Sequence, residues 1–247
     1  MMSNKDIHQT YFSASQNLLY SLVLIFPMLF LYELLGFINN FEANYKIRNG
    51  ADALIRELFS IFAPNSHLFY GFTLLLIFFS VIYRHRQVLI MREINIRFLV
   101  LMVIESFFWC AGLLIAMKVS NTLFLASPIR VDILEQFYLS IGAGIWEELI
   151  FRFGLISVFV YLINSVFRYG KAFSLLLSLF LSGVIFSLFH YIGIYGDIFT
   201  WKIFILRTIA GIFLGAVFLF RGLGISVYTH IFYDMVLVSI PVLGFTS

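Results

Sequence analysis

The sequence predicts an all-α, polytopic integral membrane protein with seven or eight transmembrane helices. Of its 247 residues, 62% are hydrophobic and only 12% are charged. The mean hydropathy is +0.98. A soluble domain of this length could not bury so much apolar surface, whereas a bilayer accommodates it. The alternation of apolar and polar residues that marks a membrane β-barrel is absent, so the apolar stretches are expected to be helices.

The individual spans follow from length, because a helix that crosses the hydrocarbon core needs about 20 mainly apolar residues. Seven stretches meet or approach that length, namely Leu18–Ile38, Leu68–Tyr83, Phe98–Met117, Tyr138–Ile163, Ala172–Ile192, Trp201–Phe220 and Ile225–Leu243. The fourth stretch is long, and a break at Gly142–Gly144 would create an eighth span. We expect the last four spans to form a common helical core.

Two further patterns concern packing. Leu54, Leu58 and Phe62 recur every four residues within Ala51–Phe62. This spacing predicts an amphipathic helix that either lies on the membrane surface or packs on the protein. The pair Gly211 and Gly215 has the spacing that allows two membrane helices to approach closely.

The charge pattern limits the partners. The formal net charge is only +3, and no basic run exceeds the cluster Arg84–Arg86. We therefore expect a lipid bilayer and no nucleic acid among the partners. Cys110 is the single cysteine and lies in an apolar run, which excludes an internal disulfide and favours inert packing over nucleophilic chemistry.

Ionisable residues inside the apolar stretches are the features that point to function. They form three short patterns, Glu147-Glu148-x-x-x-Arg152, Phe186-x-x-x-His190 and His230-x-x-x-Asp234. A charge at the bilayer centre costs on the order of 3 to 10 kcal/mol, depending on the scale. Two explanations are open: polar pairs that hold helices together, or a hydrolytic site built within the membrane.

The first pattern gives two neighbouring acids different surroundings. Glu148 and Arg152 are four residues apart, so on a helix they share a face and can form an ion pair. Glu147 points about 100° away around the helix and remains available for proton transfer. The structural alternative is that both acids only pair with Arg152 and Arg207.

The three patterns together favour the hydrolytic site. Each lies on a different span, and each ionisable group avoids lipid only by facing the interior of the bundle, where the groups can converge on water. Glu147 with His190 would form a general base that activates this water. His230 with Asp234 would stabilise the developing oxyanion.

The ordered set EELIFR at 147–152, FSLFH at 186–190 and HIFYD at 230–234 resembles the CPBP intramembrane proteases, which include CAAX prenyl proteases and bacteriocin-processing proteins. The resemblance covers about residues 138–238. It implies a glutamic-type protease without an obligatory metal or other cofactor. It assigns catalysis to Glu147, His190, His230 and Asp234, and support of the site to Glu148, Arg152 and Phe186.

The resemblance also implies an organisation and a substrate. Residues 1–137 would contribute transmembrane helices and interfacial segments without a motif, and residues 138–247 the catalytic core. The substrate would be a membrane-tethered peptide or protein, either a CAAX-type tail or a bacteriocin-type leader. Asp234 departs from the asparagine that is often found there, so it would act protonated or by orienting His230.

Alternative functions remain open at this point. Glu147, His190 and His230 also compose a possible catalytic zinc site, although the compact HExxH motif is absent. A transporter with a proton relay is a different class, but two matching halves with broken helices are not visible. A non-catalytic membrane protein that binds peptide, such as an immunity protein, would need no base.

Overall fold

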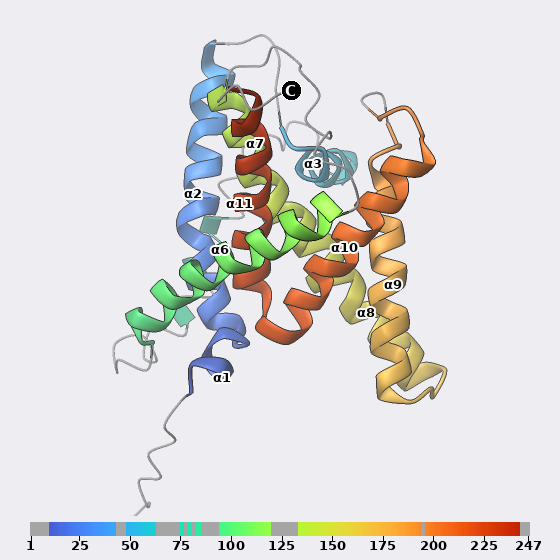
Figure 1. Cartoon of the computed structure of the whole chain (residues 1–247). Helices are drawn as coiled ribbons and strands as arrows, with labels where there is room; N and C mark the ends of the chain where they lie inside the picture. Colours follow the sequence, from blue (N-terminus) through green and yellow to red (C-terminus); the bar gives the residue numbers. More distant parts are fainter. Residues whose placement is uncertain are drawn as a thin grey trace, which may run out of the picture.

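The computed structural model describes residues 10–42, 48–62, 75–76, 79–80, 83–84, 94–119, 133–193 and 196–242. All regular secondary structure in these ranges is helical, which confirms the predicted class. With the labels of Figure 1, the elements are α1 (Tyr11–Ser15), α2 (Leu18–Glu42), α3 (Gly50–Phe62), α6 (Ile96–Val119), α7 (Ile133–Glu147), η1 (Glu148–Ile156), α8 (Ser157–Tyr161), η2 (Leu162–Val166), α9 (Lys171–Phe189), α10 (Trp201–Arg221) and α11 (Leu223–Val242).

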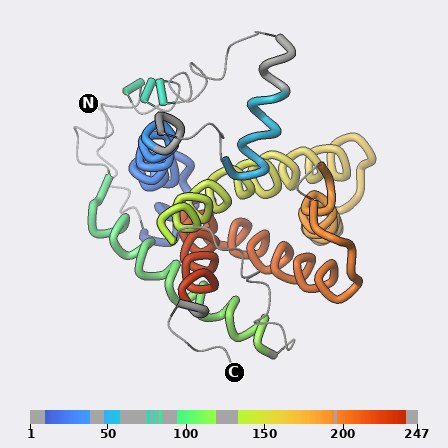
Figure 2. Tube along the Cα trace, turned by 90° about the horizontal axis from the view of Figure 1, so that it is seen from above, coloured from blue at the N-terminus to red at the C-terminus, as the bar shows by residue number. Residues whose placement is uncertain are grey.

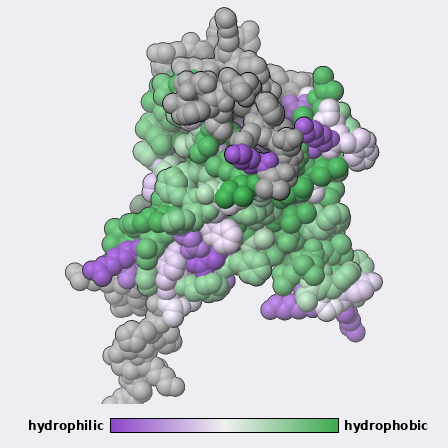
Figure 3. Space-filling view, viewed as in Figure 1, coloured by the Kyte–Doolittle hydropathy of each residue, from purple (hydrophilic) through white to green (hydrophobic). Residues whose placement is uncertain are grey.

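Five segments of the described chain are helical, long and apolar enough to cross a membrane, so the protein is a multi-pass membrane protein. They are Leu18–Ile38, Ile96–Lys118, Ile133–Val166, Lys171–Phe189 and Trp201–Arg221. The expected span Leu68–Tyr83 lies largely outside the described residues, and the apolar helix Leu223–Ser239 is shorter than these five. A count of seven or eight spans therefore stays a prediction. Figure 3 shows hydrophobic residues across the middle of one face, with hydrophilic residues chiefly toward its margins.

Helix α11 is the centre of the bundle. It packs against α2, α6, α7 and α10, and α9 packs along α10 and η1 (Figure 1). Ile225, Val227 and Ile231 of α11 are buried in the same core as Ile145 of α7 and Leu29 of α2. This central position brings the polar residues of α11 next to the helix that carries the paired acids.

Glycines allow the closest approaches between these helices. A Cβ on Gly144 of α7 would lie 3.0 Å from the Val227 carbonyl oxygen of α11. A Cβ on Gly211 of α10 would lie 3.0 Å from the Cα of Gly183 in α9. The close helix packing predicted from the Gly211–Gly215 spacing is thus confirmed, with α9 as the neighbour.

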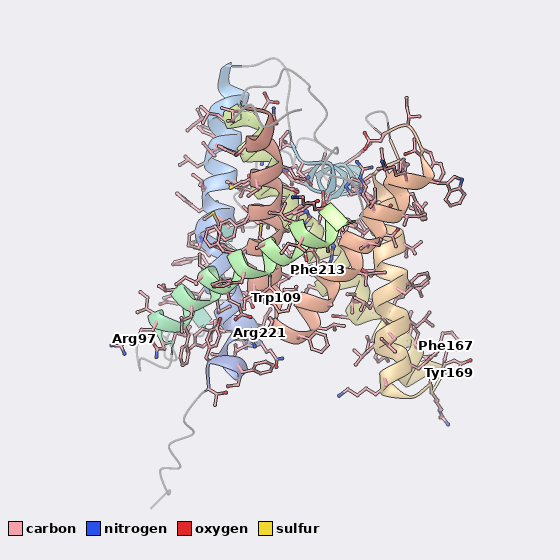
Figure 4. All side chains as sticks on the ribbon, in the orientation of Figure 1. Arg97, Trp109, Phe167, Tyr169, Phe213 and Arg221 are labelled. Carbon is pink, nitrogen blue, oxygen red and sulfur yellow. The ribbon has the colours of Figure 1, made fainter. Side chains whose placement is uncertain are left out.

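Helix α6 crosses the bundle at a steep tilt and contacts α10 at two points (Figures 1 and 4). The rings of Trp109 and Phe213 meet edge to face, with centroids 5.9 Å apart, where α6 passes α10. Near the end of α10, Arg221 Nε lies 2.5 Å from the Glu105 carboxylate of α6. Tyr11 of α1 donates to the same carboxylate at 2.5 Å.

Helix α3 confirms the predicted helix at Ala51–Phe62 and lies roughly across the direction of α2 (Figures 1 and 2). Its first turns pack on protein. Asp52 and Arg56 are buried, and Arg56 pairs with Glu33 of α2 at 2.6 Å. The beginning of α3 is therefore attached to the bundle, and it starts beside α7.

Candidate active site

The two neighbouring acids lie at a change of helix type. α7 ends at Glu147, and the π-helix η1 begins at Glu148. The predicted break at Gly142–Gly144 is wrong, because α7 continues through these glycines, which serve close packing, and Ile133–Val166 forms one long helical span. π-helical turns are rare and occur frequently at functional sites.

The altered backbone of η1 is supported from α9. The hydroxyl of Ser182 donates to the Phe151 carbonyl at 2.7 Å, and Ser182 is only 2% exposed. A buried carbonyl needs such a donor when the regular helical hydrogen bonds are shifted. The register of η1, and with it the direction of the Glu148 and Arg152 side chains, is thereby fixed relative to α9.

Glu148 is completely enclosed by partners. Its carboxylate accepts from the Ser226 hydroxyl at 2.5 Å and from His230 Nδ1 at 2.9 Å, and it lies 3.1 Å from Arg152 Nη1. Glu148 and Arg152 are both 0% exposed. The predicted ion pair at spacing four is confirmed. Glu148 is committed to holding Arg152, Ser226 and His230 in place.

Glu147 has a different environment. It is 5% exposed. Its Oε1 accepts from Asn49 Nδ2 at 3.2 Å, and its Oε2 lies 3.8 Å from His230 Nε2. The alternative in which the two acids only pair with Arg152 and Arg207 does not hold, because Arg207 pairs with Asp197 instead. Glu147 thus faces the imidazole without being enclosed by an arginine partner of its own.

His230 lies between three carboxylates. Nδ1 faces Glu148, while Nε2 faces Asp234 Oδ2 at 3.5 Å and Glu147 Oε2 at 3.8 Å. A carboxylate can only accept, so the Nδ1 proton is held toward Glu148. The side chain of Asp234 is 27% exposed, against 6% for His230, so Asp234 lies toward the open side of the cluster.

His190 follows the last residue of α9. Its Nδ1 lies 2.9 Å from the Phe186 carbonyl, which can only accept, so in the neutral ring Nε2 is the acceptor. Burial lowers the pKa of His190 from its ordinary value, and the Glu147 carboxylate opposes part of this shift. The lowered pKa favours the neutral ring. Glu147 acts on His190 through its charge, whereas Glu147 Oε2 lies 3.8 Å from His230 Nε2.

Phe186 connects the two histidines. Its ring meets His190 with centroids 5.0 Å apart and His230 at 6.2 Å, both edge to face. The Arg152 guanidinium lies over the same ring, 4.3 Å from its centroid. All seven residues predicted for the site therefore belong to one connected cluster, with His190 at its edge.

Two members of the cluster were not predicted from the sequence. Ser226 precedes His230 by four residues, so a polar position on the same helical face was a usable signal. Asn49 lies about 100 residues before Glu147 in the chain, and no local pattern marks it. Among the described residues, no three His, Cys, Asp or Glu side chains are arranged to hold a metal ion.

These features define a class, a multi-pass helical membrane protein with a buried cluster of acids, histidines and an arginine. Residues 129–236 match the family described as "Rce1-like: Type II CAAX prenyl endopeptidase Rce1-like". This part of the chain carries a match to the family that the resemblance predicted, and it contains every predicted site residue. The family implies an intramembrane protease with a protein substrate. No curated protein and no solved structure matches the chain.

Proposed function

We propose that the protein is an intramembrane endopeptidase of the glutamic type, in which Glu147 activates water for attack on a peptide bond. The observation that supports this most is the different use of two adjacent acids. Glu148 is fully buried and saturated by Arg152, Ser226 and His230. Glu147 faces His230 Nε2 across 3.8 Å, so it is the acid that can exchange a proton with a reacting molecule.

The chemistry then needs no covalent intermediate with the protein. Glu147 takes a proton from water while the water oxygen bonds to the peptide carbonyl carbon. The neutral His190 accepts from the same water through Nε2, which helps to orient it. The carbonyl oxygen becomes an oxyanion that a proton on His230 Nε2 stabilises. Glu147 returns its proton to the amine nitrogen as the C–N bond breaks.

Asp234 acts through His230 in this proposal. Its Oδ2 lies 3.5 Å from Nε2, on the more open side of the cluster. A carboxylate there favours a proton on Nε2, the atom that would donate to the oxyanion. Asp234 therefore orients and charges the imidazole instead of donating to the substrate itself.

For the substrate, the buried site and the family together favour a membrane-tethered peptide or protein. Residues 138–247 would carry the catalytic core, and residues 1–137 would add helices around it. A prenylated C-terminal tail and a leader peptide both fit this description.

Terminal-peptide proteomics tests the proposal. Membranes with the native protein should contain peptide ends that are missing with Glu147→Gln, which keeps the shape of the side chain but removes the base. Hydrolysis of such a substrate should fall by about 10² or more. Glu135→Gln, on the same helix and about three turns away, is the matched control. If native and Glu147→Gln membranes give the same peptide ends, hydrolysis is excluded and a peptide-binding protein takes its place.

A further inference from the structure

Asn49 connects the N-terminal part of the chain to the acid Glu147. It directly precedes α3, and its Nδ2 donates to Glu147 Oε1 at 3.2 Å. The amide has one orientation only, because its Oδ1 accepts the backbone N–H of Ala51 at 2.9 Å. With the oxygen used as the cap of α3, the nitrogen must face the carboxylate.

The position of Asn49 is fixed by a buried ion-pair cluster between α2 and α3. Arg56 lies 2.6 Å from Glu33 and 2.7 Å from Asp52, and Arg48 lies 3.2 Å from Glu33. Two cations and two anions balance each other there, and Asp52 is 0% exposed. Asn49 lies within this cluster in sequence, between Arg48 and Asp52, so it has little freedom to move.

Two tyrosines and a glycine complete the support. The Asn49 backbone N–H donates to Tyr32 Oη at 3.3 Å, and Tyr32 Oη donates to Asp52 at 2.9 Å. The Tyr32 ring stacks on Tyr138 of α7, with centroids 4.7 Å apart. A Cβ on Gly142 would lie 2.5 Å from the Tyr32 ring and 3.0 Å from Asn49 Cβ. Glycine at position 142 therefore makes room for Asn49 beside α7, in the helix that ends at Glu147.

We propose that Asn49 is a positioning residue for Glu147: it holds Oε1 of the carboxylate so that Oε2 faces His230 Nε2 and the attacking water. This inference rests on the proposed function, and it adds a residue from outside the matched family domain at 129–236. It also gives α3 a role. The ion-pair cluster with α2 sets where α3 begins. Asn49 at the beginning of α3 then sets the direction of the Glu147 carboxylate.

The chain offers a closely matched control. Asn95 precedes α6, its Oδ1 accepts the N–H of Arg97 at 3.0 Å, and its own N–H donates to Tyr20 Oη at 2.9 Å. Asn95 thus repeats the local contacts of Asn49 at another helix start, away from Glu147. Serine keeps the cap acceptor and removes the amide donor at either position.

The experiment compares Asn49→Ser, Asn49→Asp and Asn95→Ser in the full-length protein. The substrate is a peptide whose Glu147-dependent cleavage the terminal-peptide comparison has identified, and kcat is normalised to the folded fraction. Asn49→Ser should lower kcat about 10- to 100-fold with little change in KM, because misplacing a reacting group by about 1 Å can cost on the order of 10²-fold. Asn49→Asp should lower it further, since a second carboxylate then faces Glu147. Asn95→Ser should keep the native kcat. An equal kcat loss in Asn49→Ser and Asn95→Ser overturns the inference.

A spectroscopic readout separates this inference from the proposed function. The infrared carboxylate band of Glu147 is identified by its loss in Glu147→Gln. It should shift in Asn49→Ser, where Oε1 loses its donor, and stay unchanged in Asn95→Ser. An unshifted band overturns the role of Asn49 whether or not the protein hydrolyses peptides. A shifted band in a protein without Glu147-dependent cleavage keeps the contact but overturns the catalytic proposal.

Discussion

Arg152→Ala should strongly destabilise the protein as well as inactivate it. Arg152 is 0% exposed and lies 3.1 Å from Glu148, which is also 0% exposed. Its guanidinium also covers the Phe186 ring at 4.3 Å. Removing it leaves Glu148 with Ser226 and His230 but without its permanent positive partner, and leaves a gap beside an aromatic ring.

The expected loss is about 3–5 kcal/mol of unfolding free energy, which is the usual cost of removing one partner of a buried ion pair. Arg207→Ala is the comparison. Arg207 pairs with Asp197, whose side chain is 50% exposed. An exposed pair of this kind contributes only about 0–1 kcal/mol. Comparing the two variants therefore separates the effect of losing a buried ion pair from the effect of losing a positive charge.

Equilibrium unfolding in mixed micelles measures both variants against the native protein. A third variant tests the cause: Arg152→Met combined with Glu148→Gln removes both charges, so it should regain part of the stability that Arg152→Ala loses. If Arg152→Ala loses no more stability than Arg207→Ala, the buried pair does not hold the site together. Arg152 would then be assigned to substrate binding.

Three further predictions concern the π-helix, the oxyanion side and metal. Ser182→Ala should lower the free energy of unfolding by about 1–3 kcal/mol, because the buried Phe151 carbonyl loses its donor. Ser178→Ala should lower it less, since the Ser178 hydroxyl donates within α9. Equilibrium unfolding of both variants measures the difference. Asp234→Asn should lose hydrolysis about as strongly as Asp234→Ala, because neither side chain keeps the carboxylate that favours a proton on His230 Nε2; kcat/KM for both variants checks this, and full activity in Asp234→Asn would instead make residue 234 a direct donor to the oxyanion. A chelator should leave the rate largely unchanged, and a loss that added zinc restores would instead support the zinc alternative.

Much of the fold could be predicted from the sequence because apolar length is a strong signal in membrane proteins. Predicted Leu18–Ile38 lies within α2, and predicted Trp201–Phe220 ends one residue before α10 does. The interior of the fourth span was harder. Glycines at 142 and 144 were interpreted as a helix break, but they admit Tyr32 and the backbone of α11 against an intact helix. The π-helix at Glu148 has no local sequence signal of this kind.

The site could be predicted as a set of residues but not as an arrangement. The cost of burying charge in lipid pointed to Glu147, Glu148, Arg152 and His230, and these lie together. The sequence did not show that Glu148 is the acid bound to His230 Nδ1 while Glu147 faces Nε2. Asn49 was missed because its partner is remote in the chain and the contact depends on where α3 begins.

The position of Asn49 bears on how the chain divides. The predicted boundary after residue 137 follows the motifs, and the family domain begins close to it, at residue 129. Yet α2 packs against both α7 and α11, and Asn49 donates to Glu147 from the other side of that boundary. Neighbouring residues on one helix point about 100° apart, so Glu147 and Glu148 take different partners. The N-terminal part therefore supplies a donor to Oε1 of Glu147, while α11 supplies His230 opposite Oε2.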